Sequence, residues 1–202
     1  MPAMSTVERA FCRSGPWRGF SSRVVVPWVL DGRALTGETL ELGTGSGAMA
    51  EVLLQRFPSI RLRGTDVDPK MVESARSRLA PFGPRVTVEQ ADATSLPFES
   101  GEFDAVVSFL MLHHVIDWER ALSEAARVLR PGGMLFGYDL VDTWAAETLH
   151  RLDGSPHRLA TPDGLRSCLS ELGLDDVRTA SSLGGLVVRF SATRVTTEHD
   201  LT

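Results

Sequence analysis

The spacing of hydrophobic positions changes repeatedly between residues 39 and 140. Short, nearly continuous apolar runs, which are typical of strands buried in a parallel sheet, alternate with stretches whose apolar residues recur every three or four positions, as on one face of a helix. The strand-like runs cover residues 39–42, 60–66, 85–90, 103–110 and 134–140. Because strands and helices alternate five times, the pattern predicts an α/β fold with a doubly wound, mostly parallel sheet and helices on both faces.

Polar residues and prolines mark the ends of the predicted helices. Asp68 and Pro69 begin the helix after the second strand, with Asp68 as the N-cap and Pro69 as the first helical residue. A helix over residues 117–130 follows the fourth strand, and the Pro-Gly-Gly sequence at 131–133 ends it. Ahead of the first strand, the apolar run 24–30 predicts a further helix that packs against the sheet.

The chain beyond residue 140 is predicted to close the sheet. Its segments are a short helix at 143–151, a loop at 153–157, a helix capped by Thr161, and two strand-like runs at 176–180 and 186–193. The connection between the two runs is too short for a parallel crossover, so they must form an antiparallel hairpin. The complete prediction is a seven-stranded sheet whose last strand is antiparallel.

The first strand leads into a glycine-rich turn, Glu41-Leu42-Gly43-Thr44-Gly45-Ser46-Gly47, and then into a helix. Alternating glycines suit a backbone that bends sharply and lets a ligand approach closely. The dinucleotide fingerprint Gly-x-Gly-x-x-Gly is not met, because Ala48 follows Gly47, and the turn lacks the Gly-Lys-Ser/Thr of a phosphate loop. Glu41 disfavours a pyrophosphate and favours a ligand with a positive charge. A tight strand–helix connection without a ligand is the simpler alternative.

Two more carboxylates follow strand-like runs. Asp66 lies roughly twenty residues after the glycine turn, which is the spacing at which a carboxylate on the next strand accepts both hydroxyl protons of a ribose. Asp92 can accept from the exocyclic amine of an adenine, while the backbone N–H of Ala93 reaches a ring nitrogen. Each aspartate has an alternative as a turn residue. Since parallel strands end at one edge of a sheet, we expect Glu41, Asp66 and Asp92 to surround one ligand.

Composition places the chain among ordinary soluble domains, with 202 residues, 43% hydrophobic and 23% charged residues and a net charge of −5. The acidic balance argues against a nucleic-acid surface. The apolar runs fall short of the ~20 residues of a membrane span, and residues 1–10 lack the pattern of a secretory signal. Cys12 and Cys168 are far apart in sequence, so we expect neither a disulfide nor a metal site, and we expect a cytoplasmic protein.

Five motifs occur in order along residues 39–194. They are Leu40 to Gly47, Gly-Thr-Asp-Val-Asp-Pro-Lys-Met at 64–71, Asp-Ala-Thr-Ser-Leu-Pro-Phe at 92–98, the stretch from Phe103 through Val115, and Arg-Val-Leu-Arg-Pro-Gly-Gly at 127–133. Together they resemble the motifs of class I, Rossmann-like S-adenosylmethionine-dependent methyltransferases, in particular the branch that acts on small molecules. That family inserts its last strand antiparallel into the sheet, in agreement with the predicted hairpin.

The resemblance implies a role for each motif. Glu41 and the glycine turn would hold the methionine end of S-adenosyl-L-methionine, Asp66 would bind the ribose hydroxyls, and Asp92 would read the adenine edge. Ser108 and Phe109 would face the methionine moiety and the methyl group. The expected cofactor-binding residues are Glu41, Gly43, Gly45, Gly47, Asp66, Val67, Asp92, Ala93, Ser108 and Phe109.

Methyl transfer to a hydroxyl or to a carbon acid requires a base, whereas transfer to a thiolate or an amine depends less strongly on a base. His113 and His114 follow the fourth strand and titrate near neutral pH, so they are the expected catalytic residues. His157 and Asp139 are weaker candidates. The alternative for His113 and His114 is a hydrogen bond to backbone at the end of the strand.

We expect one domain, residues 1–202, in three parts. These parts are a helical lid or cap at 1–37, a cofactor-binding core at 38–140, and a substrate-side insert with the closing hairpin at 141–195. The aromatic residues Phe11, Trp17 and Phe20 of the first part either cover the ligand cleft or only dock the N-terminus on the core. Tyr138 and Trp144 are expected to line the acceptor pocket.

The predicted function is methyl transfer from S-adenosyl-L-methionine to a small organic acceptor by in-line displacement, without nucleic-acid or membrane partners. The Asn-Pro-Pro-Tyr motif of methyltransferases that act on amino groups of DNA bases is absent after the fourth strand. Two alternatives stay open: a regulatory protein that binds S-adenosylmethionine but has lost catalysis, and a nicotinamide-dependent oxidoreductase. The sequence does not name the acceptor, and it leaves the oligomeric state open, with a homodimer among the options.

Overall fold

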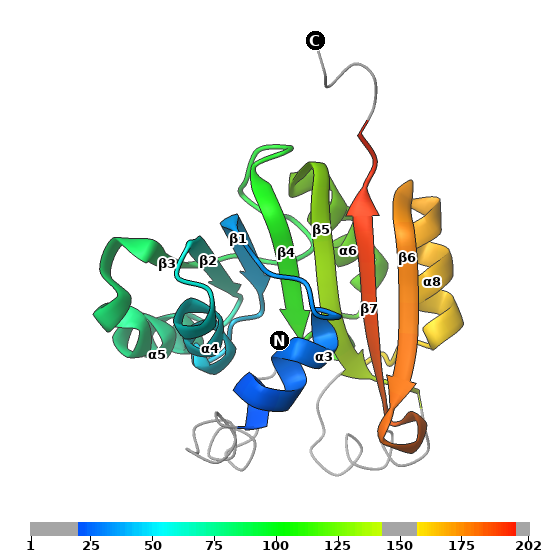
Figure 1. Cartoon of the computed structure of the whole chain (residues 1–202), viewed down its shortest axis with the longest axis horizontal. Coiled ribbons are helices and arrows are strands. Elements are labelled where there is room, and N and C mark those ends of the chain that lie inside the picture. The colour runs from blue at the N-terminus through cyan, green and yellow to red at the C-terminus, as the bar shows by residue number, and fades with distance from the viewer. Residues whose placement is uncertain (1–19, 143–156, 197–202) are drawn as a thin grey trace.

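The computed structural model of the chain describes residues 20–142 and 157–196. Seven strands form one sheet in the order β3-β2-β1-β4-β5-β7-β6 (Figure 1). The strands are β1 Gly37–Leu42, β2 Ile60–Asp66, β3 Val86–Gln90, β4 Phe103–Phe109, β5 Leu129–Leu140, β6 Leu174–Ser182 and β7 Val187–Arg194. β1 to β5 pair in parallel, whereas β7 is antiparallel to both β5 and β6. The predicted fold class is confirmed.

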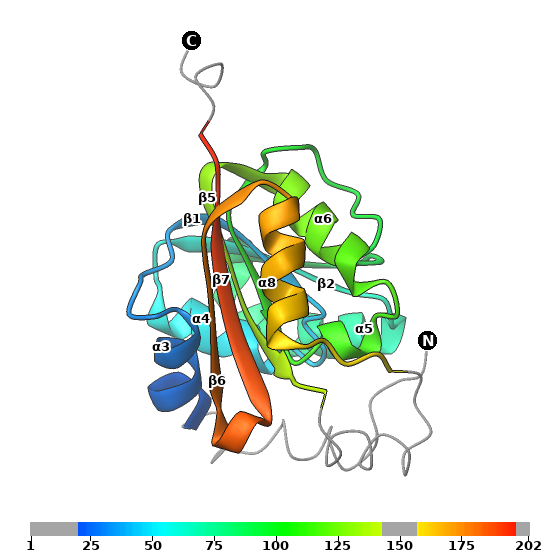
Figure 2. The same cartoon turned by 90° about the vertical axis from the view of Figure 1, so that its right-hand side faces the viewer.

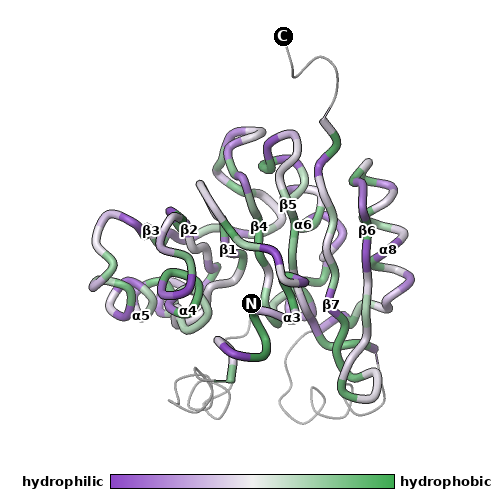
Figure 3. The backbone as a smooth tube through the Cα atoms, in the orientation of Figure 1, coloured by the Kyte–Doolittle hydropathy of each residue, from purple (hydrophilic) through white to green (hydrophobic). Residues whose placement is uncertain are grey.

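Helices cover both faces of the sheet, as the alternating pattern predicts. The helical elements of the described residues include the π-helical turn η1 Ser21–Val25, α3 Val26–Val29, α4 Ala48–Arg56, α5 Pro69–Leu79, the 3₁₀ segment η2 Ala80–Arg85, α6 Trp118–Val128 and α8 Pro162–Glu171. The helices η1, α3, α4 and α5 share one hydrophobic cluster with the sheet, and α6 and α8 share the other. Figure 2 shows α3 and α8 on opposite sides of the β6–β7 pair. Along α8, purple and green alternate (Figure 3), as expected for a helix with one buried face.

Side chains at the helix starts satisfy backbone N–H groups that have no partner inside the helix. Asp68 accepts from the N–H of Lys70 at 2.8 Å, with Pro69 as the first helical residue of α5. Thr161 accepts from the N–H of Gly164 at 3.0 Å at the start of α8. The assignment of Asp68 as a cap is therefore confirmed.

The prediction that the fourth-strand helix runs to Arg130 is wrong by two residues, because α6 ends at Val128 and β5 begins at Leu129. Leu129 pairs with Phe103 of β4, and the register then shifts before Ala105. Arg194 of β7 also donates its guanidinium to the carbonyl oxygens of Arg127 and Leu129. These contacts from distant segments outweigh the helical pattern of the local sequence.

The helix ahead of β1 packs on the sheet, as predicted. Val26, Val29 and Leu30 are buried against the same cluster as α4 and α5. Figure 1 shows η1 and α3 near the ends at which the arrowheads of β4 and β5 point. Phe11 and Trp17 lie outside the described residues. Whether these two aromatic residues cover the ligand cleft or only dock the N-terminus therefore stays open. Among the helices of residues 20–142 and 157–196, none has the length and apolar character needed to cross a bilayer.

Candidate active site

The glycine turn between β1 and α4 adopts a backbone that most residues avoid. Gly43, Gly45 and Gly47 have φ angles of +63°, +54° and +79°. A Cβ on Gly47 would come within 3.2 Å of the Cα of Ala75, and a Cβ on Gly43 would overlap the side chain of Met111. The turn therefore requires glycine at these positions both for conformation and for close packing.

Glu41 lies beneath this turn and is only 1% exposed. Its carboxyl accepts a hydrogen bond from the Thr44 hydroxyl. Burial raises the pKa of Glu41 to about 8; the Thr44 hydrogen bond opposes this rise, and the neighbouring charge of Asp66 adds to it. A cation arriving next to Glu41 would favour its ionised form, so the carboxyl is suited to a positively charged ligand group.

Asp66 ends β2 and joins it to the glycine turn. Its Oδ2 accepts the N–H of Gly45 at 2.8 Å and its Oδ1 accepts the N–H of Asp68 at 2.9 Å. Burial raises the pKa of Asp66, and the two backbone hydrogen bonds pull in the opposite direction. Each carboxylate oxygen has two acceptor sites, so both retain capacity for a hydroxyl donor. Asp66 and Glu41 therefore lie at one locus, as expected.

Asp92 follows β3 and is exposed. Its Oδ1 accepts both the backbone N–H of Thr94 at 2.9 Å and the Thr94 hydroxyl at 2.8 Å. This is the geometry of an aspartate that forms a turn. The Oδ1 of Asp92 therefore acts as a turn acceptor, which is the alternative to a ligand contact given in the sequence analysis. The turn is tied to β2 because the N–H of Ala91 donates to the Asp66 carbonyl at 3.1 Å, and the Val67 carbonyl accepts from Gln90 at 3.0 Å. Ala93 is half-buried in this turn.

Ser108 lies in β4 beside Leu42 of β1 and Gly137 of β5. It is 0% exposed, and its hydroxyl has no hydrogen-bond partner among the described residues. A buried polar group left unsatisfied costs about 1–3 kcal/mol, so it marks a place where a polar ligand or water is expected. Phe109, the next residue, packs its ring 5.8 Å from that of Tyr138, which in turn meets Trp28 at 6.1 Å.

The chain turns sharply after β4. Leu110 has a φ of +50°, an uncommon conformation for a residue with a branched side chain. This turn brings Met111 over Gly43, and the 3₁₀ turn η3 Leu112–His114 follows. The segment after β4 therefore connects the glycine turn with the two histidines. The hydrophobic pattern of the sequence does not predict this contact.

His113 pairs with Asp139 of β5, and both side chains are buried, at 5% and 2% exposure. The ring Nδ1 contacts Asp139 Oδ1. The same carboxylate accepts the backbone N–H groups of Leu112 at 2.7 Å, His113 at 3.4 Å and Leu140 at 2.7 Å. The His114 ring lies 4.0 Å from the His113 ring. The sequence allows a contact between a histidine and backbone here, whereas in the structure the His113 ring contacts the buried carboxylate of Asp139.

Other candidates from the sequence lie nearby or beyond the described part. His157 is half-buried, and the N–H of Arg158 donates to the carbonyl of His113 at 3.0 Å. Arg158 forms two contacts with Glu119, at 2.5 and 2.6 Å, and its guanidinium lies 5.4 Å from the Trp118 ring. Trp144 lies outside the described residues. Met111 and Trp28 are not among the residues that the sequence predicts for the site, because their contacts arise only in the folded chain.

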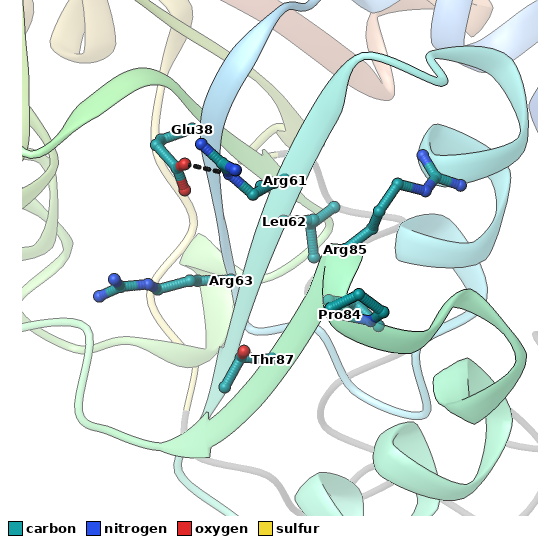
Figure 4. Close-up of a pocket in the computed structure, with 8 residues that line it drawn as sticks. Glu38, Arg61, Leu62, Arg63, Pro84, Arg85 and Thr87 are labelled. Carbon is teal, nitrogen blue, oxygen red and sulfur yellow. Dashed lines mark hydrogen bonds and ion pairs between the residues drawn. The ribbon is translucent and has the colours of Figure 1, made fainter.

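A separate pocket of about 220 Å³ opens at the other end of the sheet (Figure 4). Its lining residues are Glu38, Arg61, Leu62, Arg63, Pro84, Arg85, Val86 and Thr87. Glu38 and Arg61 form an ion pair there at 2.6 Å. These residues lie in the first halves of β1, β2 and β3 or, for Pro84 and Arg85, just before β3, whereas Glu41, Asp66 and Asp92 lie near or after strand ends. The pocket therefore does not belong to the candidate site.

Known structures share this architecture. Phosphoethanolamine N-methyltransferase 2 of Haemonchus contortus, solved in complex with phosphomonomethylethanolamine and S-adenosylhomocysteine, superimposes with a TM-score of 0.74 at 16% identity. The match covers 87% of this chain and 52% of that one. The likeness shows that the chain shares the Rossmann-like fold of that structure.

Sequence comparisons identify the family. The "Methyltransferase domain" family matches residues 40–137. A demethylmenaquinone methyltransferase of Thermus thermophilus is 42% identical over 96 residues, which are 48% of this chain and 44% of the relative. A malonyl-[acyl-carrier protein] O-methyltransferase of Geobacter sulfurreducens is 34% identical over 149 residues, 68% of this chain and 55% of the relative. Residues 40–137 match this family, and the comparisons together support a class I S-adenosylmethionine-dependent methyltransferase with S-adenosyl-L-methionine as its cofactor. It matches these two relatives over about half of their length.

Proposed function

We propose that the chain binds S-adenosyl-L-methionine over the glycine turn and transfers its methyl group to a small organic acceptor. The observation that carries this proposal is the buried Glu41 carboxyl, whose pKa burial raises to about 8. The groups that act on this carboxyl are Thr44 and Asp66, and neither is a cation. A ligand that brings an ammonium group supplies the missing charge.

Three features of the described residues suit this cofactor. The turn at Gly43 to Gly47 bends through positive φ angles at its three glycines, Asp66 retains acceptor capacity for ribose hydroxyls, and Ser108 holds an unsatisfied buried hydroxyl. Asp92 and Ala93 are proposed at the adenine edge, with Asp92 using the oxygen that does not serve its own turn. Val67 is proposed to lie against the adenine, and Phe109 to face the methyl group.

The cofactor supplies an activated methyl group on a sulfonium, and the chain's own residues position the acceptor and remove water. His113 or His114 is proposed as the base where the acceptor must lose a proton. Phe109, Tyr138 and Trp28 form a row of aromatic rings beside these histidines' strand end, and we propose them as the apolar wall of the acceptor pocket.

The acceptor is proposed only as a class. The relatives' names give demethylmenaquinone and a malonyl group on acyl-carrier protein, two chemically different acceptors. The family match covers residues 40–137, the region that carries the glycine turn and the strand-end carboxylates. The comparisons therefore support a common cofactor more strongly than a common acceptor.

The test is calorimetric titration of the chain with S-adenosylhomocysteine and, separately, with NAD. Binding of the first without the second is expected; binding of NAD alone would favour the oxidoreductase alternative. Tritiated methyl transfer from S-adenosylmethionine to the small-molecule fraction of a cell extract then distinguishes an enzyme from a regulatory binding protein. Glu41→Gln serves as the matched variant, since it removes the charge but keeps an acceptor for Thr44.

A further inference from the structure

Asp139 uses its whole carboxylate to hold one short turn. The backbone N–H groups of Leu112, His113 and Leu140 and the Nδ1 of His113 all contact it. A carboxylate offers about four acceptor sites, and these four contacts occupy them. Asp139 is therefore unsuited to take a proton from an acceptor molecule, although the sequence alone leaves it among the candidate bases.

The same contacts decide the protonation pattern of His113. Because Nδ1 faces the carboxylate, it carries the ring proton, and in a neutral imidazole the remaining nitrogen, Nε2, is then the one that accepts a proton. The carboxylate also holds the His113 backbone, so ring and main chain are fixed from one side. The positive φ of Leu110 just before this turn is a strained conformation of a kind that concentrates at functional sites.

We infer, resting on the proposed function, that Asp139 is a positioning residue that presents His113 Nε2 as the proton acceptor, and that the site takes acceptors whose reacting atom carries a proton: a hydroxyl or an acidic carbon. Such a buried pair offers no advantage to a thiolate or a neutral amine, which already present a lone pair. The Asp139 contacts described above go to Leu112, His113 and Leu140, so the geometry selects His113 over its neighbour His114.

The proton and electron balance of the step is simple. The acceptor's proton moves to His113 Nε2 as its oxygen or carbon forms a bond to the methyl carbon. The C–S bond breaks with its electron pair staying on sulfur, so the sulfonium becomes a neutral thioether. The positive charge now resides on the His113 imidazolium, next to the Asp139 carboxylate, until the proton leaves to solvent.

The experiment compares two probes of one shape, 2-naphthol and 2-naphthalenethiol, with the full chain and tritiated S-adenosylmethionine at neutral pH. Phenols lose their proton near pH 10 and thiols at lower pH, so only the naphthol depends strongly on a base. His113→Gln is expected to slow naphthol methylation by about 100-fold or more and the thiol reaction by less than about 3-fold, in line with the usual contribution of a general base.

Asp139→Asn is expected to act in the same direction, and Asp175→Asn, at an exposed aspartate of β6, is the matched control with unchanged rates. Near-ultraviolet circular dichroism checks folding; if Asp139→Asn does not fold, His113→Gln still decides the question. In ¹⁵N NMR, the wild-type His113 ring is expected to carry its proton on Nδ1, and a proton on Nε2 would contradict the inference.

Several outcomes overturn the inference. They are an equal loss for both probes, no loss for either, a loss confined to His114→Gln, and a wild type that binds S-adenosylhomocysteine but does not methylate the naphthol. A wild type that fails to bind S-adenosylhomocysteine in the calorimeter would instead remove the proposed function, and this inference with it. The two failures are therefore distinguishable.

Discussion

The two halves of the candidate site are built in different ways. Around β1, β2 and β3 the site consists of a glycine backbone and of carboxylates at strand ends, with contacts such as that between the Gly45 N–H and Asp66. Beyond β4 it consists of side chains that distant segments bring together, such as Asp139 with His113 and Arg189 with Trp28. The family match at residues 40–137 covers the first half and also His113, whereas Trp28, Asp139 and Arg189 lie outside it.

The family match covers the two halves of the site to different extents. The family match ends at residue 137, before Asp139 and well before β7. The relatives that match this chain carry different acceptors in their names. We infer that cofactor binding and acceptor choice are separable in this molecule.

The largest effect is expected from Glu41. Its folded-state pKa is raised from 4.5 to about 8, so the native protein keeps a proton that the unfolded chain releases. The resulting stability is present below about pH 4.5 and is lost as the pH rises toward 8, at about 1.4 kcal/mol for each unit of pKa shift. Glu41→Gln removes this pH dependence, and urea unfolding between pH 5 and pH 9 measures it.

A ligand sharpens the Glu41 prediction. If an ammonium group binds next to Glu41, saturating S-adenosylhomocysteine should flatten the pH dependence of the wild type, because the ionised carboxylate then has a partner. An identical slope for wild type and Glu41→Gln without ligand would contradict the assigned cause, and an unchanged slope with bound ligand would place the ammonium elsewhere.

The second effect concerns the close packing of Gly43. Gly43→Ala adds a Cβ that overlaps Met111 at a φ of +63°, so overpacking adds to the conformational cost, for a total of about 2–5 kcal/mol. Gly83→Ala is the matched control, since its φ is +57° and no atom lies within 4 Å of the added Cβ. Unfolding by urea gives the difference, and addition of Met111→Ala should recover part of it.

The third effect is a loss of cofactor affinity. Asp66→Ala removes an acceptor that the proposal assigns to the ribose, so the affinity for S-adenosylhomocysteine should fall at least tenfold, as a charged hydrogen bond contributes ~1.5–3 kcal/mol. Asp117→Ala removes a helix cap of α6 and should lower stability without changing this affinity. Equal affinities of Asp66→Ala and the wild type, measured by calorimetry, would refute the ribose role.

The sequence predicts the first half of the site better than the second, for a physical reason. The alternation of strands and helices, the Asp68 cap and the Glu41–Asp66 locus follow from local periodicity, cap residues and the shared edge of parallel strands. The Asp139 contacts and the end of α6 depend on segments that meet only after folding, such as Arg194 against the α6 carboxyl end. For Asp92, the turn contact with Thr94 and the proposed ligand contact use the same short side chain, and spacing cannot separate them.

The smallest effect is expected at the N-terminal helix. It tests whether a change in the half of the site proposed for the acceptor leaves cofactor binding unchanged. Arg189 of β7 donates to the Trp28 carbonyl at 2.5 Å, pairs with Asp31 at 2.8 Å and lies 5.8 Å from the Trp28 ring. Arg189→Met keeps an apolar stem but removes these contacts, so backbone hydrogen exchange in residues 20–31 should quicken by about tenfold at most, because Val26, Val29 and Leu30 stay buried.

The affinity for S-adenosylhomocysteine should stay within about twofold in Arg189→Met, because the helix does not contact the glycine turn through Arg189. Arg178→Met is the matched control, since exposed Arg178 reaches Asp31 at 3.6 Å and Asp176 at 4.0 Å, and its loss should leave exchange nearly unchanged. A fall in affinity as large as that of Asp66→Ala would show that the helix supports both halves of the site, and cofactor binding and acceptor choice would then have to be treated as one coupled property of the fold.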